Sequence, residues 1–133
     1  MNKPLDKKPM SVALGVIGGS GAYDLLTNGG LGEKVNTVTL KTPFGESAPV
    51  HHFRAGNLHY LFLSRHGETD YSITAPFVNY RANIYALKEC GVERIISWSG
   101  PGIINTSFKP GDYILPSDII DETRNRETTF FKN

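Results

Sequence analysis

Apolar positions along the chain fall into short runs that stop at glycine, proline or polar residues. Runs of roughly four to eight residues with such boundaries are typical of β-strands. The pattern predicts strands at residues 11–17, 33–40, 50–54, 58–64, 94–99 and 113–120. Two of these strands flank Ala55-Gly56-Asn57, a sequence that predicts a hairpin with a glycine turn.

Helical spacing of apolar residues is clearest between residues 78 and 87. It predicts a helix from Pro76 to about Glu89, and Gly91 is well placed to end it. A shorter helix is expected to begin near Ala22. Strands, one long helix and further strands together favour an α/β fold with a mixed, partly parallel central sheet and flanking helices. Residues 1–10 are rich in lysine and proline and are expected to form a loose tail, and residues 11–133 the α/β domain.

Composition excludes several classes of protein. The 14 Lys and Arg residues almost balance the 13 Asp and Glu residues, and no basic stripe argues for a nucleic-acid partner. Cys90 is the single cysteine, so the chain has no internal disulfide, as is usual in a reducing compartment. No apolar run approaches the length of about 20 residues that a membrane-spanning helix needs. A cytoplasmic protein without a membrane partner is therefore expected.

The apolar run that starts at Leu61 stops abruptly at Ser64-Arg65-His66-Gly67. It predicts a buried strand that delivers an arginine and a histidine at its carboxyl end, where ligands gather in open α/β sheets. Arginine offers a rigid fork of donors that fits a phosphate, and glycine allows the backbone to approach closely. The segment therefore predicts an oxyanion site. The alternative is an Arg-His pair that simply lies on the surface at a strand end.

Residues 65–69, RHGET, also resemble the signature of histidine phosphatases, in which the histidine is the nucleophile. In that family the motif lies on the first strand, whereas two or three predicted strands precede it here. A second catalytic histidine is expected downstream of the motif, yet His51, His52 and His59 all lie upstream. The phosphatase interpretation is therefore disfavoured.

Two further clusters have a functional and an ordinary interpretation. Gly18-Gly19-Ser20-Gly21 follows a predicted strand and offers free N–H groups and a hydroxyl to a phosphate. It matches neither the dinucleotide fingerprint nor the Walker loop, and a tight turn is the ordinary alternative. The adjacent His51 and His52 are expected to point to opposite faces of a strand. No metal site is expected, because no cluster of ligands has the required spacing.

Several motifs in a fixed order give the chain a specific resemblance. They are VIGGSG at 16–21, TPFG at 42–45 with Ser47, RHG at 65–67, VNYRANIYALKECGV at 78–92, KPGD at 109–112 and IDETRNRETTFF at 120–131. Together they resemble the N-terminal half of a methylthioadenosine phosphorylase, a member of the nucleoside phosphorylase family that includes purine nucleoside phosphorylase. The resemblance covers nearly the whole chain after residue 10.

The resemblance implies a trimeric enzyme in which inorganic phosphate attacks C1′ of a purine nucleoside and releases the free base and a ribose 1-phosphate. Phosphate would be a co-substrate, and no further cofactor or metal is implied. Phosphate-binding roles carry over by resemblance to Ser20, Arg65, His66, Ser99 and Gly100. No residue is assigned to acid–base catalysis. The implied partners are a purine nucleoside, phosphate and further copies of the chain.

Three residues depart from the family's pattern. Trp98 and Pro101 stand in a segment where relatives commonly carry small residues, so the shape of the pocket is open. Asp70 stands where relatives often carry a second histidine, close to the expected phosphate. The chain is also about half the family's length, and the missing half is expected to supply the groups that recognise the base. A half-domain that binds phosphate and needs a partner chain for activity is therefore the alternative hypothesis.

Overall fold

The computed structural model describes residues 12–131, so the tail predicted at residues 1–10 lies outside the described part of the chain. The chain divides into two units, residues 1–99 and residues 100–133, which are described separately. All helices and strands of the described residues belong to the first unit.

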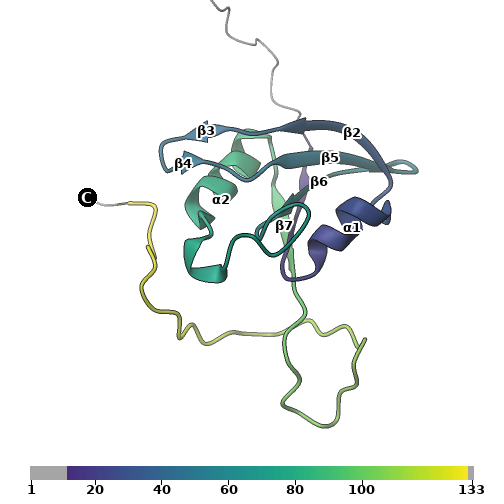
Figure 1. Cartoon of the computed structure of the whole chain (residues 1–133), viewed down its shortest axis with the longest axis vertical. Helices are drawn as coiled ribbons and strands as arrows, with labels where there is room; N and C mark the ends of the chain where they lie inside the picture. The colour runs from purple at the N-terminus through teal and green to yellow at the C-terminus, as the bar shows by residue number, and fades with distance from the viewer. Residues whose placement is uncertain (1–11, 132–133) are drawn as a thin grey trace, which may run out of the picture. The chain divides into compact units, whose positions relative to one another are not determined.

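A five-stranded sheet forms the centre of the first unit (Figure 1). Its strands are β2 (Glu33–Val38), β5 (Val50–Ala55), β6 (Leu58–Ser64), β1 (Leu14–Gly18) and β7 (Arg94–Trp98), in that spatial order. β1 pairs in parallel with both β6 and β7, whereas β5 is antiparallel to β2 and β6. A two-stranded ribbon joins β3 (Lys41–Thr42) and β4 (Gly45–Glu46). The predicted mixed, partly parallel sheet is confirmed.

The predicted hairpin is confirmed with a two-residue turn, since Ala55 lies opposite Leu58 and only Gly56-Asn57 connects β5 to β6. Gly56 has a φ of 61°, in the left-handed region that glycine adopts without strain. The turn therefore fixes the register of β6, whose other end carries Ser64, and Arg65 follows directly.

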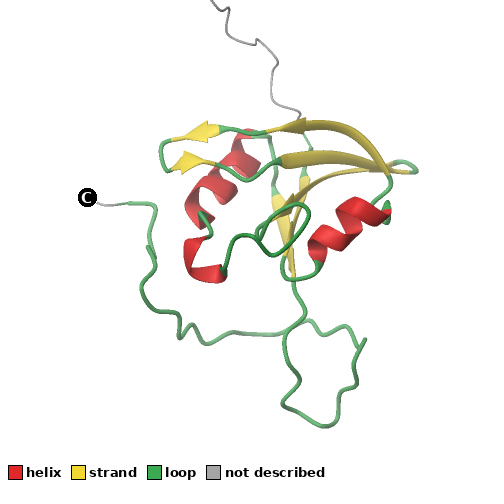
Figure 2. Ribbon diagram, viewed as in Figure 1, coloured by secondary structure: helices red, strands yellow, loops and turns green. Residues whose placement is uncertain are grey.

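Two α-helices flank the sheet, α1 (Ala22–Asn28) and α2 (Tyr80–Glu89) (Figure 2). The prediction placed the start of the longer helix at Pro76, which instead lies in a 3-10 turn at Ala75–Phe77. The α-helix begins later because the Asn79 side chain accepts a hydrogen bond of 3.2 Å from the Ala82 N–H and caps its first turn. The C-terminal end lies close to the predicted position, with Gly91 at a φ of 85° just beyond it.

Side chains on β6 alternate between two apolar clusters, as expected for a strand with both faces covered. Leu61 and Leu63 pack in one cluster with α2, where Leu87 is fully buried. Tyr60 and Phe62 pack in the other cluster, with Ala22 of α1. The apolar run that the sequence shows is thus the central strand of the core.

The TPFG and VNYRAN motifs are bonded to each other. The Asn79 amide donates 2.8 Å to the Phe44 carbonyl, and the Ala48 N–H donates 2.8 Å to Oδ1 of Asn83. The Phe44 ring also meets the Tyr85 ring edge-on, at 5.8 Å between centroids. These contacts join the start of α2 to the β3–β4 ribbon, so both motifs have a structural role.

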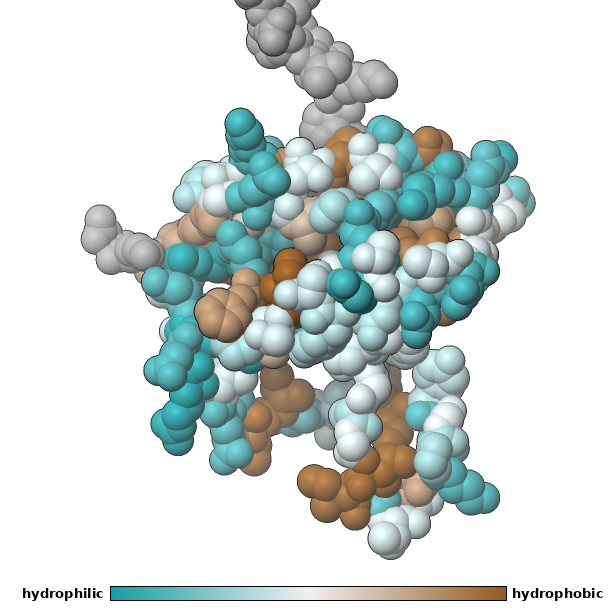
Figure 3. Space-filling model, in the orientation of Figure 1, coloured by the Kyte–Doolittle hydropathy of each residue, from teal (hydrophilic) through white to brown (hydrophobic). Residues whose placement is uncertain are grey.

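Residues 100–131 contain no helix or strand, so the strand predicted at 113–120 is wrong. A strand forms only where its backbone groups pair with a neighbour, and none of the described residues pairs with this segment. Its large apolar side chains are open to solvent: Ile104 and Leu115 are each 96% exposed. Brown apolar side chains are visible on the molecular surface in Figure 3.

Candidate anion-binding site

Three adjacent parallel strands bring the predicted site residues to one edge of the sheet. In the register of β6, β1 and β7, Gly18 lies opposite both Ser64 and Trp98, so the three carboxyl ends are level. The pairing continues one residue further, because the Gly19 N–H donates 2.7 Å to the Trp98 carbonyl and the Arg65 N–H donates 3.1 Å to the Gly18 carbonyl. The residues that follow each strand therefore meet here.

Gly19 marks the point where two of the predicted side chains converge. A Cβ added to this buried glycine would lie 2.8 Å from Oγ of Ser99 and 3.1 Å from Nη2 of Arg65. The absence of a side chain at Gly19 thus lets a hydroxyl and a guanidinium group approach the same stretch of backbone. A neutral donor and a cation, both next to a glycine, are the groups that hold a phosphate oxygen.

Two other residues of the predicted site, Ser20 and Gly100, each come two residues after the end of a strand, β1 and β7 respectively. Ser20 is exposed and follows Gly19 directly, ahead of Gly21, whose φ is 81°. Gly100 is the first residue of the second unit, so the arrangement around Gly19 is formed by residues of the first unit alone. Gly19 itself was not among the predicted site residues, although its place in a glycine run after a buried strand is a sequence feature that could have indicated it.

His66 is almost fully buried, with 1% of its surface exposed. Its Nε2 accepts a 3.1 Å hydrogen bond from Nε of Arg65, and its Nδ1 donates 2.8 Å to the Ile73 carbonyl. The ring also stacks on Tyr71, with 4.3 Å between centroids. Because both ring nitrogens are engaged, neither is free to act as a nucleophile, and this geometry argues against the histidine-phosphatase interpretation.

Ser64, the last residue of β6, is buried and its hydroxyl has no hydrogen-bond partner among the residues that the structure describes. Buried hydroxyl groups are nearly always bonded to protein or to ordered water. The unsatisfied group lies directly before Arg65 in the chain. It is therefore at the strand end to which the anion site is assigned.

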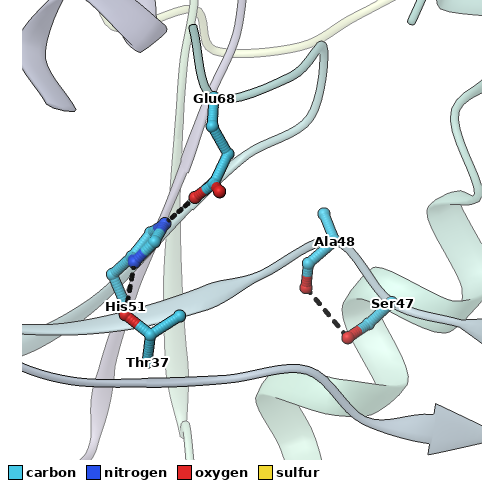
Figure 4. Close-up of polar contacts among 5 residues, drawn as sticks. All are labelled: Thr37, Ser47, Ala48, His51 and Glu68. Atoms are coloured by element: carbon cyan, nitrogen blue, oxygen red, sulfur yellow. Dashed lines mark hydrogen bonds and ion pairs between the residues drawn. The ribbon is translucent and has the colours of Figure 1, made fainter. Parts of the chain in front are cut away.

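His51 links the sheet to the loop that follows His66 (Figure 4). Its Nδ1 lies 2.8 Å from Oγ1 of Thr37 on β2, and its Nε2 is paired with the Glu68 carboxylate. Burial lowers the pKa of His51 below 6.5, and the opposing attraction of Glu68 is the smaller effect. This pair could not be predicted from the sequence, since Glu68 reaches the sheet only through the path of its loop.

We expect the free energy of unfolding to fall as the pH decreases from about 7 to about 5. The unfolded chain binds a proton at His51 below pH 6.5, while the folded chain resists it, so the unfolded state gains protons first. His52, whose pKa is also lowered by burial, acts in the same direction. Urea unfolding at several pH values measures the slope. His51→Gln is expected to have a shallower slope than the wild-type chain, and equal slopes would contradict the assignment.

The expectation that His51 and His52 point to opposite faces of their strand is confirmed. His51 contacts Thr37 and Glu68, whereas His52 lies 2.9 Å from His59 through Nε2 and Nδ1. Within residues 12–131, no three His, Cys, Asp or Glu side chains are grouped so that they could hold a metal ion. The same residues contain no helix with the length and apolar character needed to cross a membrane.

Residues 13–133 match the family model described as the phosphorylase superfamily. The chain belongs to this superfamily. The resemblance that the sequence motifs indicated is thereby confirmed, over almost the whole of the described chain.

Named relatives in the superfamily are nucleoside phosphorylases. The chain is 42% identical over 121 residues to a probable 6-oxopurine nucleoside phosphorylase of Thermococcus kodakarensis, and 40% identical over 120 residues to an S-methyl-5′-thioadenosine phosphorylase of Saccharolobus solfataricus. These alignments cover 89% and 90% of this chain but only 42% and 43% of the relatives. The chain therefore spans well under half the length of these proteins.

A solved structure supports the same fold. Methylthioadenosine phosphorylase from Schistosoma mansoni, in complex with adenine, superimposes with a TM-score of 0.57 at 36% identity. The superposition covers 65% of this chain and 29% of the phosphorylase. The phosphorylase-superfamily chain thus has a partial form of the nucleoside phosphorylase fold, as the sequence predicted.

Two of the three unusual residues, Trp98 and Asp70, lie in the first unit. Trp98 packs against the apolar cluster of Phe53, Tyr60 and Phe62, which places its ring within the fold. Asp70 is exposed, and its carboxylate oxygen would lie 3.5 Å from a Cβ added to Gly67. Gly67, with a φ of 126°, is the point where the loop after His66 turns back. Pro101 belongs to the second unit.

Proposed function

We propose that the chain forms the phosphate-binding part of a purine nucleoside phosphorylase. The proposed reaction transfers the ribosyl group of a nucleoside, of the methylthioadenosine or methylthioinosine type, from the purine to inorganic phosphate. The single observation that supports it most directly is the convergence of Ser99 and Arg65 at Gly19, beyond three level strand ends. The names of the relatives, which cover both 6-aminopurine and 6-oxopurine nucleosides, support the proposed substrate class.

In this proposal Arg65 is the clamp that holds the phosphate. Its backbone is held by the N–H bond to the Gly18 carbonyl, and its guanidinium group is held by the bond from Nε to His66. The hydroxyl groups of Ser99 and Ser20 would complete the set of donors, and the role of Gly100, which belongs to the second unit, stays a prediction from the resemblance. The proposed role of His66 is to support this set, and the unsatisfied Ser64 hydroxyl belongs to the last residue of β6, directly before Arg65 in the chain.

The chemistry that such a site supports is positioning and charge stabilisation. Cleavage of a glycosidic bond passes through a sugar with oxocarbenium character. A phosphate dianion held next to C1′ is both the nucleophile and the negative charge that stabilises this transition state. The phosphate is a co-substrate, and the proposal includes no other cofactor. It also includes the cytoplasmic location and the trimeric assembly that the resemblance implies.

A phosphate-dependence assay tests the proposal. The chain is incubated with methylthioadenosine, methylthioinosine or inosine, with and without inorganic phosphate, and release of the base is measured by chromatography. Base release that requires phosphate is the expected result. Phosphate binding without turnover, followed by turnover when the C-terminal part of a relative is added, would support a half-domain instead. Release of phosphate from a phosphomonoester through an adduct on His66 would contradict both.

A further inference from the structure

His66 is held from two sides, and the two sides belong to different parts of the fold. On one side Nε of Arg65 donates a 3.1 Å hydrogen bond to its Nε2. On the other side the backbone of Ile73 forms two hydrogen bonds with His66. The Ile73 carbonyl accepts a hydrogen bond of 2.8 Å from Nδ1, and the Ile73 N–H donates one of 2.8 Å to the His66 carbonyl. The residue therefore connects the loop of residues 67–73 to the arginine of the proposed site.

The partners fix the tautomer of the ring. An arginine Nε–H only donates and a peptide carbonyl only accepts. Nε2 of His66 must therefore be the unprotonated nitrogen, and Nδ1 must carry the hydrogen. A hydrogen on Nε2 would face the N–H of Arg65, so a change of tautomer breaks the contact between the two side chains.

The contact also determines which donors Arg65 has left for a ligand. A guanidinium group has five N–H donors, one on Nε and two on each terminal nitrogen. Since Nε is used by His66, the two terminal nitrogens remain, and Nη2 is the atom near Gly19. An anion is then bound end-on, by Nη1 and Nη2, rather than along the side that includes Nε.

We infer that His66 is a positioning residue, which acts on the phosphate through Arg65 and does not touch it with its own side chain. The inference rests on the proposed function and refines the role that the resemblance gave to His66. The loop of residues 67–73 sets the ring through Ile73 and Tyr71, and the ring sets the guanidinium plane. The loop itself is tied to the sheet by the pair of Glu68 and His51.

Two substitutions separate the two hydrogen bonds of the ring. Asparagine in His66→Asn places an N–H near the position of Nδ1 and leaves no acceptor for Arg65. Glutamine in His66→Gln places an amide oxygen near Nε2, so it preserves the acceptor and loses the bond to Ile73. We expect His66→Asn to weaken binding of inorganic phosphate by about tenfold to a hundredfold, the range for a lost hydrogen bond to a charged group. His66→Gln is expected to weaken it by less than about threefold.

The readouts are the dissociation constant for inorganic phosphate, from calorimetry on the chain, and the melting temperature of each variant. A purely structural role predicts that the loss of affinity follows the loss of stability in both variants. Equal phosphate affinity in His66→Asn and His66→Gln would overturn the positioning role. Where the chain shows phosphate-dependent turnover, the Michaelis constant for phosphate is expected to rise in His66→Asn, with the value for the nucleoside unchanged.

The tautomer supplies a test that does not depend on turnover. Nitrogen NMR of the imidazole ring, assigned from the signal missing in His66→Asn, is expected to show hydrogen on Nδ1 and none on Nε2. Hydrogen on Nε2 would overturn the inference even in an active enzyme. Conversely, the expected tautomer in a chain that binds no phosphate would contradict the proposed function and reduce the pair of Arg65 and His66 to a structural contact.

Discussion

Arg65→Met is expected to weaken phosphate binding by about a hundredfold to a thousandfold, the loss that two charge-assisted hydrogen bonds would produce. The side chain places a cation next to Gly19, and methionine fills similar space without a charge. Calorimetry with inorganic phosphate measures the effect on binding. In an active enzyme, the Michaelis constant for phosphate should rise much more than that for the nucleoside.

Two companion variants make this result specific. Arg65→Lys keeps the charge but removes both the fork and the Nε donor to His66, so an intermediate loss is expected. Arg54→Met removes an arginine from the opposite end of the β5–β6 hairpin, where its guanidinium pairs with Glu33 at the surface. An exposed pair contributes little and lies far along the hairpin from Arg65, so this variant should bind phosphate like the wild-type chain. Phosphate affinity unchanged in Arg65→Met would exclude Arg65 as the clamp.

Gly19→Ala is expected to impair the site while leaving the fold nearly intact. The added methyl group would lie 2.8 Å from Oγ of Ser99 and 3.1 Å from Nη2 of Arg65, both closer than real Cβ contacts usually are. Oγ of Ser99 and Nη2 of Arg65 can move aside, whereas Cβ of Ser99, at 3.0 Å, requires a backbone shift of a few tenths of an ångström at this exposed residue. Their displacement takes the two donors away from their common position. We expect about a tenfold loss of phosphate affinity, equivalent to displacing one good hydrogen bond.

Gly18→Ala, one residue earlier, is the matched control. There the added methyl group would collide with Cβ of Ala22 and lie 2.9 Å from Cζ of Phe62, which are packed core atoms. Overpacking of this kind typically lowers the free energy of unfolding by about 1–3 kcal/mol. Urea unfolding should therefore show a large effect for Gly18→Ala and a small one for Gly19→Ala. The reverse order would mean that Gly19 serves packing rather than the site.

The parts of the fold that the sequence predicted are those whose determinants are local or strongly periodic. The hairpin follows from Gly56-Asn57 between two apolar runs, and the central strand from the run at Leu61–Ser64. The start of α2 was misplaced because proline at 76 suits both a helix and a 3-10 turn, whereas the cap at Asn79 depends on its bond to Ala82. The pattern at 113–120 is apolar enough for a strand, but pattern alone does not provide the neighbour that a strand requires.

In the candidate site, too, some features could be predicted from the sequence and others could not. Arg65 was expected at the end of a buried strand, whereas Ser99, at the end of the strand predicted at 94–99, received its role by resemblance. The carboxyl ends of parallel strands share an edge, so the two residues could be expected to converge. The proximity of both to Gly19 depends on register, which no residue type reveals. The partners of His66 were also out of reach, since one of them is the backbone of Ile73, and any residue at that position supplies the same carbonyl.

The parallel register of the central strands has a consequence for how the site comes into being. Its components follow Gly18, Ser64 and Trp98, three strand ends that are distant in sequence and paired only across the sheet. A slip of one residue in either pairing would turn the side chains of the slipped strand to the opposite face. Pairings of this kind form slowly, because the intervening chain must be closed first. The arrangement at Gly19 therefore exists only in molecules whose long-range pairing is complete, and an anion bound there would recognise the finished sheet rather than any of its segments.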